Sequence, residues 1–285
     1  WRGCFCRHDA GLGLESFIGR WRNLERKNLQ MKELIQNEIE KIEASENILI
    51  LYACESGSRA WGFPSSNSDY DVRFLYVRPL EWYLSIEEGR DVVEIPISGD
   101  LDINGWDLRK ALRLFRKSNP PLLEWLGSPI IYRERFSTAS QLRALAQEYH
   151  SPLACAYHYL RMAQNGFRQS LTGETVSLKK YFYVLRPLLA IKWLENDLGV
   201  VPTLFSELVD RIVVDASLRH EIDSLVESRR SGKEKDLGER MPVIHAYIEH
   251  ELERLEEGIV APARSTPLAV VDDIFRQALR FWQAL

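Results

Sequence analysis

Apolar and polar positions divide the chain into stretches with different patterns. Between Met31 and Ala44, apolar residues recur at helical spacing among Glu and Lys, which predicts an amphipathic helix. The run Ile48–Cys54 is short and apolar on both faces, as in a central strand that is covered on both sides. A polar loop rich in Gly and Ser is predicted next, from Glu55 to Ser68.

The following strand, predicted at residues 69–77, carries charged side chains on one face. Alternation along a strand places Asp69, Asp71 and Arg73 on that face and their apolar neighbours on the other. The two aspartates therefore point in the same direction.

A hairpin and two capped helices are predicted after this strand. Strands at residues 91–97 and 101–106 are joined by Ser98-Gly99, a pair typical of a tight turn. Asp107 is suited to cap one helix and Asn119-Pro120 to begin another, because Asn favours the cap and Pro the first helical position.

Beyond about residue 137 the pattern is almost wholly helical. Long helical segments are predicted at residues 138–149, 152–170, 176–197, 204–230 and 240–257, with one more helix after Gly258. The polar segment Ser231–Gly238 predicts a linker. We therefore expect an α/β domain at residues 31–136 and a helical domain at residues 137–285.

The first thirty residues differ from the rest of the chain. They begin without Met and lack the apolar core of a signal peptide, whereas Met31 opens a far more regular segment. We expect residues 1–30 to be a non-native or disordered leader, with native translation starting at Met31.

Composition restricts the class of protein. Apolar residues make up 45% and charged residues 27% of the chain, which is ordinary for a soluble globular protein. No apolar run approaches the roughly 20 residues that span a bilayer, so no membrane partner is expected. The net charge of -4 means that nucleic-acid binding would depend on local basic patches. The four cysteines form no CxxC pair, which favours a reduced, cytoplasmic setting.

Candidate chemistry lies in Gly57-Ser58 and in the two aspartates that follow. Carboxylates one residue apart on a strand are about 6 to 7 Å apart along the backbone. Mg²⁺ prefers carboxylate oxygens and keeps positions for water and phosphate, so Asp69 and Asp71 are suited to two divalent ions and a nucleoside triphosphate. Gly57 allows close approach of the backbone to a phosphate. Such a pair also occurs at solvated strand edges, which is the alternative interpretation.

A third carboxylate is expected from the strand at residues 101–106. Asp102 is central on that strand, and its neighbours Leu101 and Ile103 face the other way. We assign Asp102 to the same metal site, where it would deprotonate or orient the acceptor hydroxyl.

Further nucleotide contacts are predicted on one helical face. Lys179, Tyr183 and Arg186 fall at positions i, i+4 and i+7, so two cations and an aromatic ring share that face. Lys and Arg would bind the triphosphate and Tyr would stack on the base. The alternative is a solvated face beside a core. Arg59 is expected either to neutralise phosphate or to pair with the aspartates.

Longer motifs resemble a known family. Gly57-Ser58, ten further residues and Asp69-x-Asp71 are similar to the signature of the polymerase beta nucleotidyltransferase superfamily. A closer resemblance is to the RNA repair pathway DNA polymerase beta family, through ESGSRAWGF, SDYDVRFLYV, GWDLRKALRL, NPPLLEWLGSPIIY and KKYFYVLRPLLAIKWL. It covers about Met31 to Leu194.

This resemblance implies an α+β fold: an N-terminal polymerase-beta-type nucleotidyltransferase domain, with a mixed sheet and helices, followed by an all-helical C-terminal domain. It also implies dependence on Mg²⁺ or Mn²⁺ and a nucleoside triphosphate (NTP) as co-substrate. The implied acceptor is RNA, either tRNA or a broken RNA end.

Three functions remain open from the sequence. The first is transfer of a nucleoside monophosphate to an RNA 3′ hydroxyl, and the second is transfer of AMP to a protein partner, as in minimal toxin-like nucleotidyltransferases. The long helical extension favours RNA or another large substrate. The third is a non-catalytic nucleotide- or RNA-binding module, against which the retention of three carboxylates argues.

Overall fold

The computed structural model describes residues 11–65, 67–232 and 237–283. Two compact units are distinguished: one contains helix α1 (Gly11–Glu46), and the other begins at Asn47. The helix predicted at Met31 to Ala44 lies within α1 and is confirmed. Residues 1–10 of the predicted leader lie outside the described residues, and its non-native origin stays a prediction.

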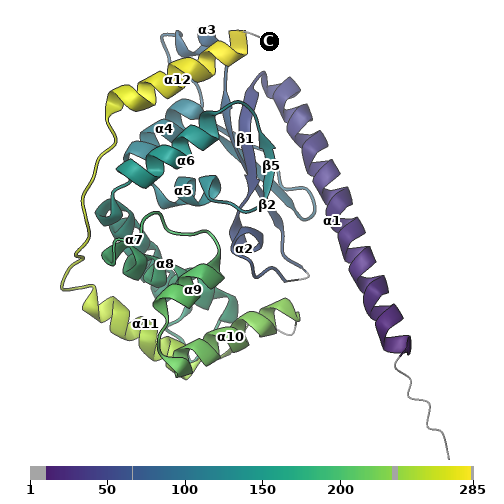
Figure 1. Cartoon of the computed structure of the whole chain (residues 1–285), viewed down its shortest axis with the longest axis vertical. Coiled ribbons are helices and arrows are strands. Elements are labelled where there is room, and N and C mark those ends of the chain that lie inside the picture. The colour runs from purple at the N-terminus through teal and green to yellow at the C-terminus, as the bar shows by residue number, and fades with distance from the viewer. Residues whose placement is uncertain (1–10, 66, 233–236, 284–285) are drawn as a thin grey trace, which may run out of the picture. The chain divides into compact units, whose positions relative to one another are not determined.

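The second unit is built on a five-stranded mixed sheet (Figure 1). Across the sheet the strands are β3 (Val92–Glu94), β4 (Leu101–Asp107), β2 (Tyr70–Val77), β1 (Leu49–Glu55) and β5 (Ile131–Glu134). Strands β2 and β4 run parallel, and the other neighbours are antiparallel. The mixed sheet is confirmed. Strand β5 was not predicted, because four residues are too few to show an alternating pattern.

The burial of the strands follows their sequence patterns. All seven residues of β1 are buried, as predicted for a strand covered on both faces. In β2 the apolar Val72 and Phe74 are buried, while Asp71 and Arg73 are only partly buried. Strand β4 alternates in the same way, and its register places Asp102 directly beside Asp71. The two carboxylates therefore lie on one face of neighbouring strands.

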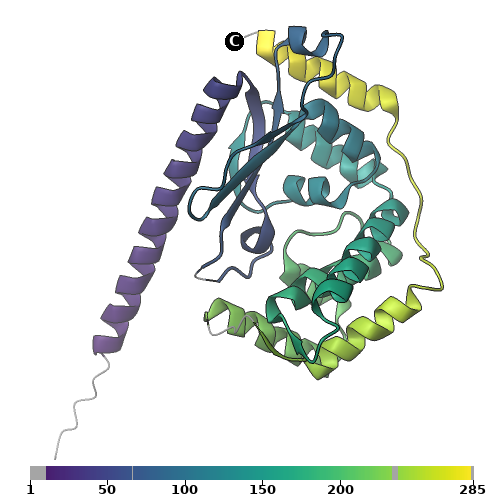
Figure 2. The same ribbon diagram turned by 180° about the vertical axis from the view of Figure 1, so that it is seen from behind.

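Three helices pack on one face of the sheet: α4 (Leu108–Arg116), α5 (Pro120–Leu126) and α6 (Thr138–Tyr149) (Figures 1 and 2). The Asp107 carboxylate caps α4 by accepting a hydrogen bond from the N–H of Arg109 at 2.8 Å. The Asn119 side chain caps α5 by accepting from the N–H of Leu122 at 3.2 Å. Both predicted caps are confirmed.

The described residues after α6 form helices and one short strand pair, β6 (Thr175–Val176) with β7 (Gly238–Glu239). Its helices are α7 (Pro152–Ser170), α8 (Leu178–Glu195), α9 (Phe205–Ile212), α10 (Ala216–Arg230), α11 (Pro242–Arg254) and α12 (Leu268–Gln283). An extended segment connects α11 to α12 along the outside of the unit (Figure 2). Two short helices, α2 (Gly57–Ala60) and α3 (Leu80–Tyr83), follow β1 and β2.

The helix predicted at residues 204–230 is broken into α9 and α10. The break lies at Val213-Val214-Asp215, where two β-branched residues precede an aspartate that caps α10. The Asp215 carboxylate accepts a hydrogen bond from the N–H of Leu218 at 2.7 Å. Residues 233–236 of the predicted linker lie outside the described residues.

An apolar core extends from β1 through α5, α7 and α8 to α12. The domain boundary predicted near residue 136 falls between β5 and α6, inside the second unit, and it stays a prediction. Among the helices of the described ranges, none has the length and apolar character to cross a bilayer.

Candidate active site

A polar cavity of about 330 Å³ brings together several of the predicted site residues. Its lining comes from the α2 loop, the start of β2, α8, and the end of α10: Ser58, Ser65, Asn67, Ser68, Asp69, Asp71, Lys179, Tyr183, Arg229 and Gly232. Acidic, hydroxyl, basic and aromatic groups thus share one cavity. Five of them, Asp69, Asp71, Ser58, Lys179 and Tyr183, are residues that the sequence predicted for the site.

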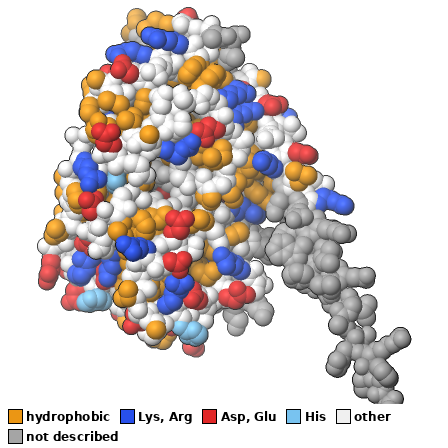
Figure 3. Space-filling view, in the orientation of Figure 1, with side chains coloured by type: hydrophobic (Ala, Val, Ile, Leu, Met, Phe, Trp, Pro, Cys, Tyr) orange, Lys and Arg blue, Asp and Glu red, His pale blue; other side chains and the backbone are white. Residues whose placement is uncertain are grey.

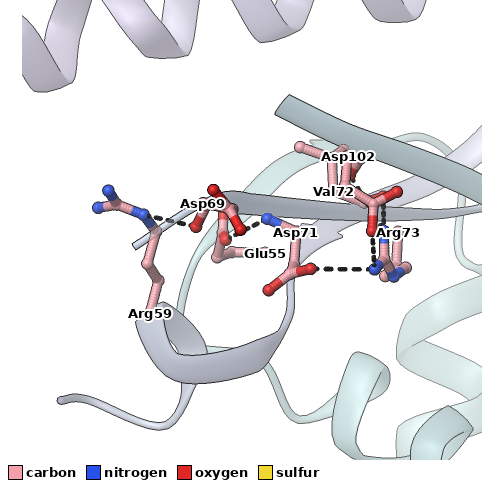
Figure 4. Close-up of polar contacts among 7 residues, drawn as sticks. All are labelled: Glu55, Arg59, Asp69, Asp71, Val72, Arg73 and Asp102. Carbon is pink, nitrogen blue, oxygen red and sulfur yellow. Dashed lines mark hydrogen bonds and ion pairs between the residues drawn. The ribbon is translucent and has the colours of Figure 1, made fainter. Parts of the chain in front are cut away.

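Arg73 links the predicted carboxylates of β2 and β4 (Figure 4). One guanidinium nitrogen of Arg73 lies 3.0 Å from Asp71 Oδ1 and 2.7 Å from Asp102 Oδ2. The other donates to the backbone oxygens of Val72 and Asp102, each at 3.0 Å. Asp71 and Asp102 therefore meet at a single cation, as their shared face and register require.

The charges around Asp71 explain its electrostatic state. Burial raises the pKa of the Asp71 carboxyl, and the neighbouring charges of Asp102 and Asp69 raise it further. Arg73 and Lys179 act in the opposite direction. Burial is thus the main reason why the charged form of Asp71 is disfavoured, and additional positive charge beside the carboxyl would favour that form.

Gly57 lies directly against the Asp71 carboxylate. Its φ of +61° belongs to the left-handed region that favours glycine. A Cβ added at this position would lie 2.1 Å from Asp71 Oδ2, so no other residue fits without a shift. The adjacent Ser58 hydroxyl donates to the Ser68 hydroxyl at 3.2 Å, and both line the cavity.

Arg59 binds the backbone of the loop before β2. Its guanidinium donates to the backbone oxygen of Ser68 at 2.8 Å. It also donates to the backbone oxygen of Asp69 at 3.0 Å (Figure 4). It also lies over the Tyr70 ring, 3.6 Å from the centroid. Arg59 therefore supports the segment that carries Asp69, whereas the sequence predicted contact with phosphate or with the carboxylates.

Arg186 does not share the cavity with Lys179 and Tyr183. It is 1% exposed and lies 2.5 Å from the Glu124 carboxylate of α5. Tyr159 of α7 and Trp61 donate to the same carboxylate at 2.9 and 3.2 Å. Because Arg186 is held inside a polar network between helices, we leave it out of the proposed nucleotide site.

Glu55 is the site-adjacent residue whose role sequence reasoning missed. Its carboxylate is fully buried and accepts hydrogen bonds from the backbone N–H of Asp71 at 2.8 Å and from the Tyr132 hydroxyl. Burial raises the pKa of Glu55 to about 7 in spite of these bonds. A signal was present, since Glu55 directly follows an apolar run that is covered on both faces and is therefore expected to be buried.

The donor set is suited to a divalent cation bound together with a phosphate. Across the described part of the chain, no three His, Cys, Asp or Glu side chains come close enough to hold a metal ion by themselves. Mg²⁺ is usually held by one or two carboxylates plus substrate phosphates, and two carboxylates, Asp69 and Asp71, line the cavity. These residues therefore fit Mg²⁺ that arrives with a nucleotide.

Two basic side chains of α4 are matched by acidic ones. On α4, Lys110 lies 2.9 Å from Asp91, and Arg113 lies 3.3 Å from Glu88. Basic and acidic side chains are interspersed on the face shown in Figure 3. The cations that line the cavity, Lys179 and Arg229, are thus better placed to receive phosphate.

Comparison with known proteins identifies the family of the chain. The family described as the RNA repair pathway DNA polymerase beta family matches residues 31–277. "Uncharacterized protein YcgL" of Bacillus subtilis (strain 168) is 54% identical over 227 residues, which are 80% of this chain and 87% of that protein. A crystal structure of a nucleotidyltransferase-like protein from Exiguobacterium sibiricum 255-15 has a TM-score of 0.30 and 13% identity, covering 87% of this chain and 80% of that one.

The last similarity is too low to carry an argument, whereas the family match covers most of the chain. It also includes every residue of the cavity, from Ser58 to Gly232. The chain therefore belongs to the RNA repair pathway DNA polymerase beta family.

Proposed function

We propose that this protein is a Mg²⁺-dependent nucleotidyltransferase that transfers a nucleoside monophosphate from an NTP to the 3′ hydroxyl of an RNA. The family supports polymerase-beta-type nucleotidyl transfer in RNA repair. One observation carries the proposal: a single cavity is lined by Asp69 and Asp71 and also by Lys179, Tyr183 and Arg229. Such a cavity offers carboxylates for a metal, cations for phosphates and a ring for a base.

The basic and aromatic residues would bind the nucleotide. Lys179 is an exposed point charge on α8, and the guanidinium of Arg229 is buried, donating to the backbone oxygen of Phe63 at 3.1 Å. Both are suited to phosphate oxygens. The Tyr183 ring is 36% exposed, and the edge of Trp61 supports it at 5.3 Å between centroids. It would stack on the base.

The carboxylates would hold the metal and the acceptor. Asp69 and Asp71 would hold Mg²⁺, which when bound supplies charge stabilisation at the phosphate under attack. We keep Asp102 as the third carboxylate, oriented by Arg73 beside Asp71. In the reaction the acceptor oxygen forms a bond to the α-phosphorus, the bond to the β-phosphate oxygen breaks, and pyrophosphate leaves. The proton of the acceptor hydroxyl passes to a nearby base, for which Asp102 is our candidate.

A transfer assay tests this function. The protein is incubated with each α-labelled NTP, with Mg²⁺ or Mn²⁺, and with RNA or lysate proteins as separate acceptors. We expect label in RNA that has a free 3′ hydroxyl and none in RNA whose 3′ end is blocked by a phosphate.

The other outcomes separate the alternatives. Label only in protein would favour AMP transfer to a protein partner. Label in neither pool, with every nucleotide, would refute transfer and favour a nucleotide- or RNA-binding module.

A further inference from the structure

The buried carboxylate of Glu55 connects β1 to both neighbouring strands. One oxygen, Oε1, accepts a hydrogen bond from the backbone N–H of Asp71 on β2 at 2.8 Å. The other, Oε2, accepts from the hydroxyl of Tyr132 on β5. Figure 4 shows the Glu55 side chain turned toward the backbone of Asp71.

The contact with Asp71 replaces a backbone hydrogen bond of the sheet. The register pairs Glu55 with Val72, so the next pair is Ser56 with Asp71. In an antiparallel ladder, a hydrogen-bonded pair exchanges two bonds. The first is present, because the N–H of Ser56 donates to the oxygen of Asp71 at 2.8 Å. The second goes from the N–H of Asp71 to the Glu55 side chain.

This replacement allows the chain to leave the sheet immediately after β1. Gly57, with a φ of +61°, then turns the backbone into α2 and against the carboxylate of Asp71. A buried N–H without an acceptor would cost about 1 to 3 kcal/mol. The loop with Gly57 and the strand end with Asp71 can hold their places together because Glu55 supplies the acceptor.

We propose that Glu55 and Tyr132 are positioning residues for nucleotidyl transfer: through the backbone of Asp71 they fix where its carboxylate lies at the cavity. This inference rests on the proposed function and deepens it. Tyr132 would hold Oε2 so that Oε1 stays directed at Asp71. A shift of about 1 Å in a catalytic group can cost about a hundredfold in rate, so the loss of one remote hydroxyl should be measurable.

Two matched tyrosine variants test the proposal. Tyr132→Phe removes the hydroxyl that binds Glu55. Tyr52→Phe, on β1 of the same sheet, removes the hydroxyl of another buried tyrosine, which donates to the backbone oxygen of Trp125 at 2.7 Å. Each variant loses one buried hydrogen bond, so we expect similar losses of stability in urea unfolding.

The two variants should differ in kcat and in Mn²⁺ binding. For Tyr132→Phe we expect kcat to fall by about tenfold or more, with little change in the KM for NTP, because Asp71 is displaced while Lys179 and Tyr183 are not. Binding of Mn²⁺ in the presence of a non-hydrolysable NTP analogue, measured by electron paramagnetic resonance, should weaken in parallel. Tyr52→Phe should keep the wild-type kcat and Mn²⁺ affinity.

Variants of Glu55 provide the rescue. In Glu55→Gln an amide oxygen remains to accept a hydrogen bond from the N–H of Asp71, so most of the transfer activity should be kept. Glu55→Ala has no such oxygen and should lose the activity.

Equal kcat and Mn²⁺ affinity in the two tyrosine variants would overturn the proposal while leaving nucleotidyl transfer intact. If the wild-type protein transferred no nucleotide, the proposed function would fail, and the Mn²⁺ titrations alone would still support or overturn the positioning of Asp71.

Discussion

At the scale of single residues, the cavity depends on side chains whose chemistry cannot be exchanged. Asp69 and Asp71 are the carboxylates that line it. Replacing either by Asn keeps the side-chain shape and removes the charge that would hold Mg²⁺. We expect Asp69→Asn and Asp71→Asn to abolish nucleotidyl transfer, measured with α-labelled NTP.

The control for these variants is Asp100→Asn, an exposed aspartate in the loop just before β4. It should transfer nucleotide like the wild type. Circular dichroism should show that all three variants remain folded. Wild-type turnover in Asp69→Asn or Asp71→Asn would refute the assignment of these residues to the metal.

Gly57 leads to a second prediction at the residue scale. Gly57→Ala introduces a Cβ that would lie 2.1 Å from Asp71 Oδ2, in a backbone with a φ of +61°. Gly99→Ala is a matched control, because its φ is +59° and nothing lies within 4 Å of the added Cβ. Both should lose about 1 kcal/mol of stability from the left-handed backbone.

Only Gly57→Ala should also lose transfer activity, because the new methyl group displaces the Asp71 carboxylate. Urea unfolding gives the stability of both variants, and the labelled transfer assay gives their activity. Equal activity in the two alanine variants would show that the close approach of Gly57 to Asp71 is unimportant.

The sequence could predict half of the residues that line the cavity, but not all of their contacts. Asp69 and Asp71 were identified by strand parity, and Lys179 with Tyr183 by helical spacing; each of these depends only on local geometry. Glu55 and Arg186 depend on partners supplied by remote elements, Tyr132 on β5 and Glu124 on α5. A local pattern contains no information on such partners.

At the scale of elements, helices and strands with a clear local pattern were predicted correctly, and those without one were missed. Strands β1, β2 and β4 were predictable because each has seven or eight residues with a clear apolar pattern. The break between α9 and α10 was missed because its apolar residues continue the helical spacing across the turn. The capping aspartate, Asp215, was the local signal that could have revealed it.

The parallel pairing of β2 with β4 could not be predicted from the sequence, yet the site depends on it. It aligns Asp71 with Asp102, so that both carboxylates reach Arg73. Alternation alone fixed which face each aspartate takes on its own strand. Only the register between strands determines that the two lie side by side.

At the scale of the whole second unit, a buried ion pair joins α5, which packs on the sheet, to α8. Arg186 of α8 and Glu124 of α5 are both buried, and the Glu124 carboxylate also accepts from Tyr159 of α7 and from Trp61. Removing one member of such a pair leaves an uncompensated buried charge and typically costs about 3 to 5 kcal/mol. We expect Arg186→Met to lose stability by about that amount in urea unfolding.

An exposed ion pair gives the control for this prediction. Arg219 is partly exposed and lies 2.8 Å from Asp210 and 3.1 Å from Asp223. Arg219→Met should cost less than about 1 kcal/mol, because solvent screens exposed pairs. Combining Arg186→Met with Glu124→Gln should recover part of the stability. Equal losses in the two single arginine variants would contradict a structural role for the buried pair.

The cavity draws its lining from segments that are far apart in the chain, and this has a consequence during protein synthesis. Ser58, Asp69 and Asp71 leave the ribosome well before Lys179 and Tyr183, and Arg229 and Gly232 follow later still. An early nascent chain therefore contains Asp71 with its partner Arg73, but without Lys179 and Arg229 of the cavity. A product that ends before α10 lacks one wall of the cavity, so the cavity is complete only after Arg229 and Gly232 have been synthesised.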